Sequence, residues 1–189
     1  MSRLIIKESE LSQIRKMYLI ENVEDKKDGT TMKASQVFWD FIKFEEGDPE
    51  KPNGSIKEPV LKAYKDTSDV WTIGYGHTGK DVKPGLVINK EQSLDLLYKD
   101  ASEAADCVRR FLGEWKELDL ETYMLTQGQF DSLVSLVFNS GCGSVRMSRF
   151  IQYIKSGQNK KATESILKYK ASNNGLKNRR KKESNMFIS

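Results

Sequence analysis

Residues 61–77 constrain the fold of this chain more than any other stretch. Apolar and polar residues alternate on both sides of residues 66–69, whose sequence Asp-Thr-Ser-Asp is rich in turn formers. This pattern predicts a β-hairpin. Gly74 and Gly76 flank Tyr75 at the end of the second strand, and glycine lets a backbone approach a ligand closely. We therefore expect the hairpin to border a binding site.

An amphipathic helix is predicted just before the hairpin, over residues 35–47. Its apolar face consists of Val37, Phe38, Phe41, Ile42 and Phe44. Gly47 provides a C-cap. The last turn of this helix carries the carboxylate of Glu46 toward the hairpin.

Three segments, in a fixed order, resemble one protein family. The first segment has three parts: Phe-Glu-Glu-Gly at residues 44–47, Leu-Lys-Ala-Tyr-Lys-Asp at residues 61–66, and Trp-Thr-Ile-Gly-Tyr-Gly-His-Thr at residues 71–78. The second and third segments are residues 125–143 and 175–187. Together they resemble the phage-type lysozymes, or endolysins, of glycoside hydrolase family 24. The resemblance implies an α+β, lysozyme-like fold, in which a small β-hairpin lobe is joined by a long helix to a larger helical lobe.

The remaining elements follow from capping boxes and apolar periodicity. A capping box at residues 89–92 opens a helix to about Phe111, which we expect to join the lobes, and one at residues 126–129 opens a strongly apolar helix. Further predictions are helices at residues 148–155 and 160–169, a basic helix at 177–182, and a short third strand at 86–88.

Two segments fall outside the resemblance. Residues 1–34 are predicted to be an N-terminal extension, in which a short amphipathic helix is followed by a polar linker at residues 24–31. Residues 35–189 then form the muramidase domain. Residues 48–58 are rich in breakers and charges and are interpreted as a surface-loop insertion beside the cleft, because family members usually lack them.

Composition suggests an anionic partner. The chain has 31 Lys and Arg against 27 Asp and Glu, a net charge of +4, so nucleic acid and cell-wall polymer both qualify.

Cys107 and Cys142 lack metal-site spacing and are interpreted as small buried side chains. We expect no metal and no cofactor.

The N-terminal sequence contains neither a signal-peptide core nor a membrane span. We therefore expect synthesis in the host cytoplasm and action in the periplasm or cell wall, after a partner such as a holin has opened the membrane. A monomer is expected.

Two carboxylates suit glycosidic-bond hydrolysis. An inverting enzyme needs a protonated carboxyl and an ionised carboxylate about 6.5–9.5 Å apart. Glu46 lies at the end of an apolar helix, an environment that favours a general acid, and Asp66 lies at a polar turn, which favours a general base. The family assigns the same roles to the matching residues.

Other site residues remain open between two interpretations. Thr72 is either a water-orienting hydroxyl, as the resemblance implies, or an ordinary β-branched strand residue. His77 is either a general base or, as the resemblance implies, a structural partner of an acidic residue. The candidates for sugar binding, each of which is alternatively a core or cap residue, are Tyr75, Thr78, Phe138, Asn139 and Ser148. Arg179 and Arg180 are interpreted as a solvated face rather than as wall contacts.

The leading hypothesis is a muramidase that cuts the β-1,4 bond between N-acetylmuramic acid and N-acetylglucosamine of bacterial peptidoglycan, for host lysis. The first alternative is a wall-binding module of a phage particle, with a lysozyme fold and little or no activity. The second is nucleic-acid binding through the basic residues 177–182, which accounts for the charge but not for the hairpin.

Overall fold

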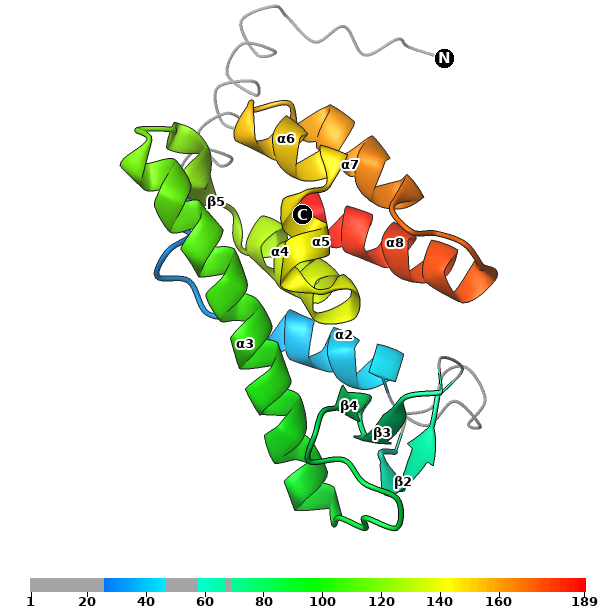
Figure 1. Ribbon diagram of the computed structural model, residues 1–189. Coiled ribbons are helices and arrows are strands. Elements are labelled where there is room, and N and C mark those ends of the chain that lie inside the picture. The colour runs from blue at the N-terminus through cyan, green and yellow to red at the C-terminus, as the bar shows by residue number, and fades with distance from the viewer. Residues whose placement is uncertain (1–25, 47–57, 67–68) are drawn as a thin grey trace, which may run out of the picture.

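The structure is a computed structural model that describes residues 26–46, 58–66 and 69–189. Helix α3 (Lys90–Glu117) runs the length of the molecule. The β lobe lies beside one end of α3, the other helices pack beside its far half, and α2 (Gln36–Glu46) lies between the two groups (Figure 1). This arrangement confirms the predicted α+β, lysozyme-like fold.

The β lobe is built on the predicted hairpin. Strands β2 (Val60–Lys65) and β3 (Trp71–Gly74) pair antiparallel, with Tyr64 opposite Thr72. A short strand that the sequence did not suggest, β4 (His77–Thr78), pairs with β3. The strand predicted at residues 86–88 is reduced to a single bridge between Val87 and Lys62. Ala63, Ile73 and Val82 form the small core of this lobe.

Helix α3 begins at the predicted capping box. The side chain of Asn89 accepts a hydrogen bond from the Gln92 N–H, and the Gln92 side chain accepts one from the Asn89 N–H. The helix continues six residues beyond the predicted end at Phe111, because Leu112 and Trp115 extend its buried stripe into the second lobe. One rigid helix therefore joins both lobes.

The helical lobe surrounds α4 (Gln127–Ser140), which begins at the predicted Thr126–Gln129 capping box and is buried from Gln129 to Val137. The elements around it are the 3₁₀ turn η1 (Glu121–Tyr123), α5 (Cys142–Arg146), α6 (Arg149–Lys155), α7 (Asn159–Lys168) and α8 (Asn174–Phe187). Phe130, Leu133 and Val134 of α4 are fully buried in the main core. The second lobe is therefore organised around the apolar helix that the sequence predicted.

The segment before α2 packs on the helical lobe. Strand β1 (Lys27–Asp28) pairs antiparallel with β5 (Met124–Leu125). Met32 is buried in the main core, and its carbonyl accepts a hydrogen bond from Arg109 at 2.9 Å. These contacts tie the C-terminal end of the predicted extension (residues 1–34) to the domain. In this part the structure differs from the prediction of a separate extension. The helix predicted within residues 1–24 lies outside the described residues.

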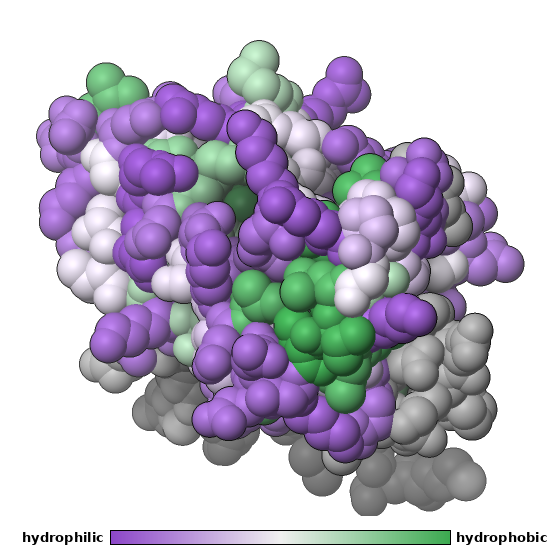
Figure 2. Space-filling model, turned by 60° about the horizontal axis from the view of Figure 1, so that its bottom comes forward, coloured by the Kyte–Doolittle hydropathy of each residue, from purple (hydrophilic) through white to green (hydrophobic). Residues whose placement is uncertain are grey.

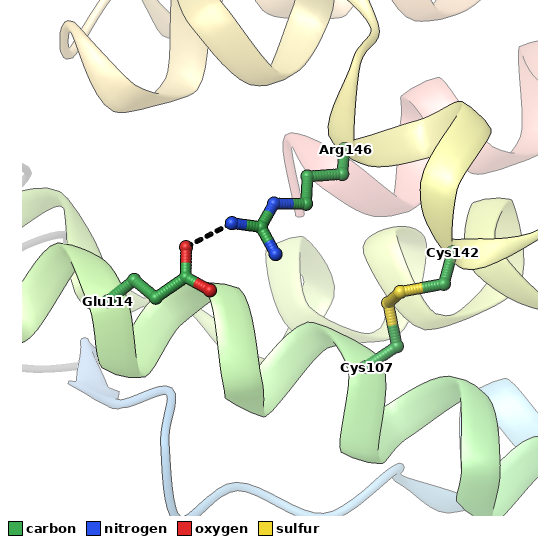
Figure 3. The surroundings of a disulfide bond; sticks show 4 residues. All are labelled: Cys107, Glu114, Cys142 and Arg146. Carbon is green, nitrogen blue, oxygen red and sulfur yellow. Dashed lines mark hydrogen bonds and ion pairs between the residues drawn. A yellow bond between two sulfur atoms is a disulfide. The ribbon is translucent and has the colours of Figure 1, made fainter.

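A disulfide connects α3 to α5. Cys107 and Cys142 are bonded, with their Cα atoms 6.0 Å apart (Figure 3). The sequence left open whether these two side chains pair, because the fold brings together two positions 35 residues apart that no local motif connects. Glu114 and Arg146 form an ion pair between the same two helices, two turns further along α3.

The surface of the β-lobe end is partly apolar. Val70 and Val87 are 44% and 65% exposed. Figure 2 views the molecule from this end and shows a hydrophobic area bordered by hydrophilic side chains. Among the helices in the described ranges, none has the length and apolar character needed to cross a membrane.

Candidate active site

A cleft of 370 Å³ separates the β lobe from the helical lobe. Gly76 and Thr78 line it from the β lobe, and Phe138 lines it from α4. One face of α3 forms its floor, with Asp100, Glu103, Ala104, Cys107 and Arg110. The cleft therefore lies beside the glycine-rich end of the hairpin, where the sequence predicted a binding site.

Glu46 lies next to Gly76, one of the residues that line this cleft. It is the last residue of α2, and its side chain is 18% exposed. Its Oε2 atom lies 3.2 Å from the position that a Cβ on Gly76 would occupy. A side chain at residue 76 would crowd this carboxylate, and the positive φ of 87° there independently favours glycine. Gly76 thus gives Glu46 access to the cleft.

The neighbouring Glu45 has a different environment. Its carboxylate accepts a hydrogen bond from Lys182 of α8 at 2.6 Å. Lys182 also lies 4.1 Å from the centroid of the Phe44 ring. Glu45 therefore forms part of the contact between α2 and α8, whereas Glu46 is next to Gly76.

Arg179 holds the other oxygen of Glu46. Its guanidinium donates through Nη1 to Glu46 Oε1 and through Nε to Glu183 Oε1, the latter at 3.2 Å. The side chain is only 6% exposed. Burial alone would lower the pKa of Arg179, but the charges of Glu46 and Glu183 outweigh it and raise the pKa, so the guanidinium stays charged.

The interpretation of Arg179 and Arg180 as a solvated face was wrong. Arg180 is fully buried and donates to the carboxylate of Glu183 and to the carbonyl of Tyr169. Glu183, also fully buried, accepts a further hydrogen bond from Ser135 of α4 at 2.6 Å. The paired charges of this cluster compensate one another, which allows arginines of a basic helix to be buried.

Asp66 directly follows β2 at the hairpin turn. Its Oδ1 atom accepts a hydrogen bond from the Val70 N–H at 2.9 Å, and its own N–H donates to the Val70 carbonyl at 3.0 Å. The Thr72 hydroxyl also donates to this carbonyl, at 3.1 Å, and the Thr72 side chain is buried. The hairpin therefore brings both predicted residues to the same carbonyl, where the Thr72 hydroxyl has a structural partner.

His77 lies between two aspartates. Its Nδ1 is 2.7 Å from Asp100 on α3, and its Nε2 is 3.1 Å from Asp81. Burial lowers the pKa of His77, but the hydrogen bonds to Asp100 and Asp81 outweigh burial and raise it. Burial in turn raises the pKa of Asp100. The ring thus joins β4 to α3 through its contact with Asp100.

The five candidate sugar-binding residues do not lie together. Thr78 and Phe138 line the cleft. Tyr75 is buried in the main core, where burial raises the pKa of its phenol. Asn139 accepts a hydrogen bond from Arg180, and Ser148 caps α6. Sequence reasoning missed the buried role of Arg179 and Glu183, although their i,i+4 spacing with opposite charges was a usable signal.

Comparison with known proteins identifies the family. The family model described as Phage lysozyme matches residues 57–183. The chain belongs to the phage lysozyme family. The match includes Asp66 and Thr72, but it begins after Glu46.

Individual relatives agree with this family. The endolysin of Bacillus phage B103 is 40% identical over 133 residues, which are 67% of this chain and 47% of the relative. The endolysin of Salmonella phage P22 is 32% identical over 136 residues, 68% of this chain and 87% of the relative. A solved endolysin from Escherichia coli O157:H7 phage FAHEc1 has a TM-score of 0.65 at 28% identity, and the alignment covers 84% of this chain and 95% of that one.

The relatives differ in how much of their length is matched. The chain spans about half the length of two Bacillus phage endolysins, 47% of the B103 protein and 49% of the PZA protein. It spans most of the P22 protein. The Bacillus phage proteins therefore contain sequence beyond the part that matches this chain.

Proposed function

We propose that this chain is a muramidase that hydrolyses the β-1,4 bond between N-acetylmuramic acid and N-acetylglucosamine in bacterial peptidoglycan. Membership of the phage lysozyme family supports the class of reaction. The observation that carries the proposal is the position of Glu46, whose Oε2 lies beside Gly76, a residue that lines the cleft between the lobes.

In this mechanism Glu46 is the general acid. Arg179 engages Oε1, so Oε2 is the oxygen that carries the proton toward the cleft. Asp66 is the general base, and the Val70 N–H fixes one of its oxygens. A water attacks the anomeric carbon, the glycosidic C–O bond breaks, Glu46 protonates the leaving oxygen and Asp66 takes the proton of the water, with inversion.

Thr72 and the cleft residues support this chemistry. If Thr72 orients the attacking water, its hydroxyl turns from the Val70 carbonyl to do so. Thr78 and Phe138 contact the glycan in the cleft, the first by hydrogen bonding and the second by its flat apolar ring. Three further residues support the cleft without lining it. Tyr75 packs in the core, Asn139 accepts a hydrogen bond from Arg180, and Ser148 caps α6.

The decisive experiment compares Glu46→Gln with Glu45→Gln. A glutamine at residue 46 keeps an oxygen that accepts from Arg179, but its amide cannot act as an acid. We expect Glu46→Gln to lower the release of reducing ends from purified sacculi about 100- to 10,000-fold. Glu45→Gln, which changes the adjacent carboxylate, should keep most of the activity. Activity in Glu46→Gln together with its loss in Glu45→Gln would refute the assignment.

The same assay separates the alternative function. A wall-binding module would bind sacculi and release no reducing ends even as the unmodified chain. For host lysis we propose that the chain, made in the host cytoplasm, reaches the wall through a membrane opened by a holin-like partner and acts as a monomer. Expression without such a partner should leave the host intact, and lysis by the chain alone would contradict this route.

A further inference from the structure

A second cavity lies on the other side of α3 from the cleft. It has a volume of 600 Å³ and is bounded by the segment before α2, by α2 and by α3. Its chemically distinctive lining residues are Thr30, Thr31, Trp39, Tyr98, Ser102 and Arg109. None of these six lines the cleft.

Helix geometry separates the two cavities. Ala104 lines the cleft and Ser102 lines the second cavity. Residues two positions apart on an α-helix are rotated by about 200° around its axis, so they point about 160° away from each other. Ala101 and Ala105 of α3 also line the second cavity. The whole width of α3 therefore lies between this cavity and the cleft.

An aromatic pair forms one wall of the second cavity. The rings of Trp39 and Tyr98 meet edge to face, with centroids 4.8 Å apart. The ring of Phe38, which is fully buried, contacts the Trp39 ring edge to face, with centroids 5.1 Å apart. Tyr98 is nevertheless 42% exposed. A rigid aromatic wall that stays open to solvent offers flat apolar surface at little entropic cost, which suits the apolar face of a sugar ring.

Polar groups surround this wall. Thr30 donates its hydroxyl proton to Asp28 at 2.6 Å, which leaves the lone pairs of the hydroxyl oxygen able to accept. Arg109 is held in place by the Met32 carbonyl at 2.9 Å and by an ion pair with Asp106, so its guanidinium is a fixed hydrogen-bond donor beside the cavity with its charge balanced. Ser102 adds an exposed hydroxyl from α3. Hydroxyls and a fixed donor group beside aromatic rings match the hydroxyl and acetamido groups and the apolar ring face of an acetylated amino sugar.

We propose that this cavity is a second glycan-binding site, which holds an amino-sugar strand of the cell wall on Trp39 and Tyr98 while the cleft acts on another strand or on a distant part of the same one. The choice of ligand rests on the proposed function. The site itself does not use Glu46 or Asp66, so binding to it is measurable in a chain that cannot hydrolyse the wall.

The test measures binding to purified sacculi by co-sedimentation, with Glu46→Gln present in every variant to prevent digestion. Tyr98→Ala should weaken binding about 2- to 10-fold, the value of one aromatic contact. Tyr98→Phe, which keeps the ring, should bind like the parent. Leu167→Ala is the matched control, because Leu167 is also 42% exposed but lies on α7.

A second variant addresses the case in which Tyr98→Ala lowers the melting temperature. Ser102→Gln adds a neutral side chain at an exposed position of α3 and narrows the cavity, and it should weaken sacculus binding as well. If Tyr98→Ala and Ser102→Gln, both folded, bind sacculi as tightly as Leu167→Ala, the second site does not exist.

Hydrolysis of a short soluble peptidoglycan oligosaccharide, in which N-acetylmuramic acid and N-acetylglucosamine alternate, separates this proposal from the proposed function. With Glu46 intact, Tyr98→Ala should leave kcat/KM on this probe unchanged, because the cleft lies across α3. A drop in kcat/KM equal to the loss of sacculus binding would assign Tyr98 to the cleft and overturn the second site. If the unmodified chain releases nothing from sacculi or probe, the muramidase proposal fails, while the Tyr98 dependence of binding still decides the second site.

Discussion

Reduction of the Cys107–Cys142 disulfide should lower the stability of the folded chain by about 4 kcal/mol. The bond closes a loop across a sequence separation of 35 residues. In the chain-entropy treatment, such a cross-link removes about 13 cal/mol/K from the unfolded chain, or about 4 kcal/mol at 25 °C. A domain of this size is stable by about 5–15 kcal/mol, so the reduced protein should fold but with a much smaller margin.

Urea denaturation followed by circular dichroism measures this difference. With a slope of about 2 kcal/mol/M, a loss of 4 kcal/mol lowers the midpoint by about 2 M. The oxidised protein is compared with the same protein in a reductant, and thiol titration under denaturing conditions should find two additional thiols after reduction. Cys107→Ala with Cys142→Ala removes the bond permanently and should unfold at a similarly low midpoint.

The double variant also provides the control. Its midpoint should not respond to reductant, because it contains no other cysteine. Equal midpoints for the oxidised and reduced wild-type protein would refute the argument, since they would show that the bond either does not form or does not restrict the unfolded chain. Both cysteines line the cleft, so hydrolysis by the reduced protein, assayed well below its melting temperature, would show whether the bond also shapes the cleft.

Three further predictions concern other contacts. Arg179→Met breaks a buried charge pair and should lower the unfolding free energy, measured in urea, by about 3–5 kcal/mol. It should also slow wall hydrolysis, measured as release of reducing ends, on the order of 100-fold, because the acid loses its partner. Lys181→Met, an exposed change on the same helix, should leave both the unfolding free energy and the rate unchanged. The pKa of His77 is raised above 6.5 in the folded state, so protonation of this ring stabilises the fold fully below about pH 6.5. That stabilisation is lost as the pH rises through the folded pKa. The unfolding free energy should therefore fall between pH 6 and 9 in the wild type and stay flatter in His77→Asn. Deleting residues 1–34 should give a lower melting temperature than deleting residues 1–25, because only the longer deletion removes the β1–β5 pairing; equal melting temperatures for the two deletions would contradict this.

Local signals were sufficient for most of the fold. The hairpin alternation, the capping boxes at Asn89 and Thr126 and the cap at Ser148 each act over a few residues, and the structure shows all of them. Strands β1 and β5 were missed because each contains only two residues, which is too short for an alternating pattern. A polar segment that pairs with a distant strand has the same composition as a linker.

Charge and spacing were misleading where the partner is distant. Arg179 and Arg180 were expected to be solvated because arginine is seldom fully buried without a partner. Their partners include Glu46, 133 residues away, and Asn139, 41 residues away. Likewise, nothing near Cys107 indicates Cys142. These contacts exist only after the helical lobe has packed, so no local pattern contains them.

The position of the proposed acid therefore depends on the packing of α8 as much as on its own helix. Glu46 ends α2, but the guanidinium that fixes its Oε1 comes from α8, and that guanidinium is fixed in turn by Glu183. Ser135 of α4 completes the chain of contacts by donating to Glu183. A shift of α8 against α4 would thus move Arg179 and reorient the Oε2 atom that faces Gly76. Because protonation of a leaving group depends on sub-ångström placement, packing changes deep in the helical lobe should alter the rate of hydrolysis even where they leave the cleft lining unchanged.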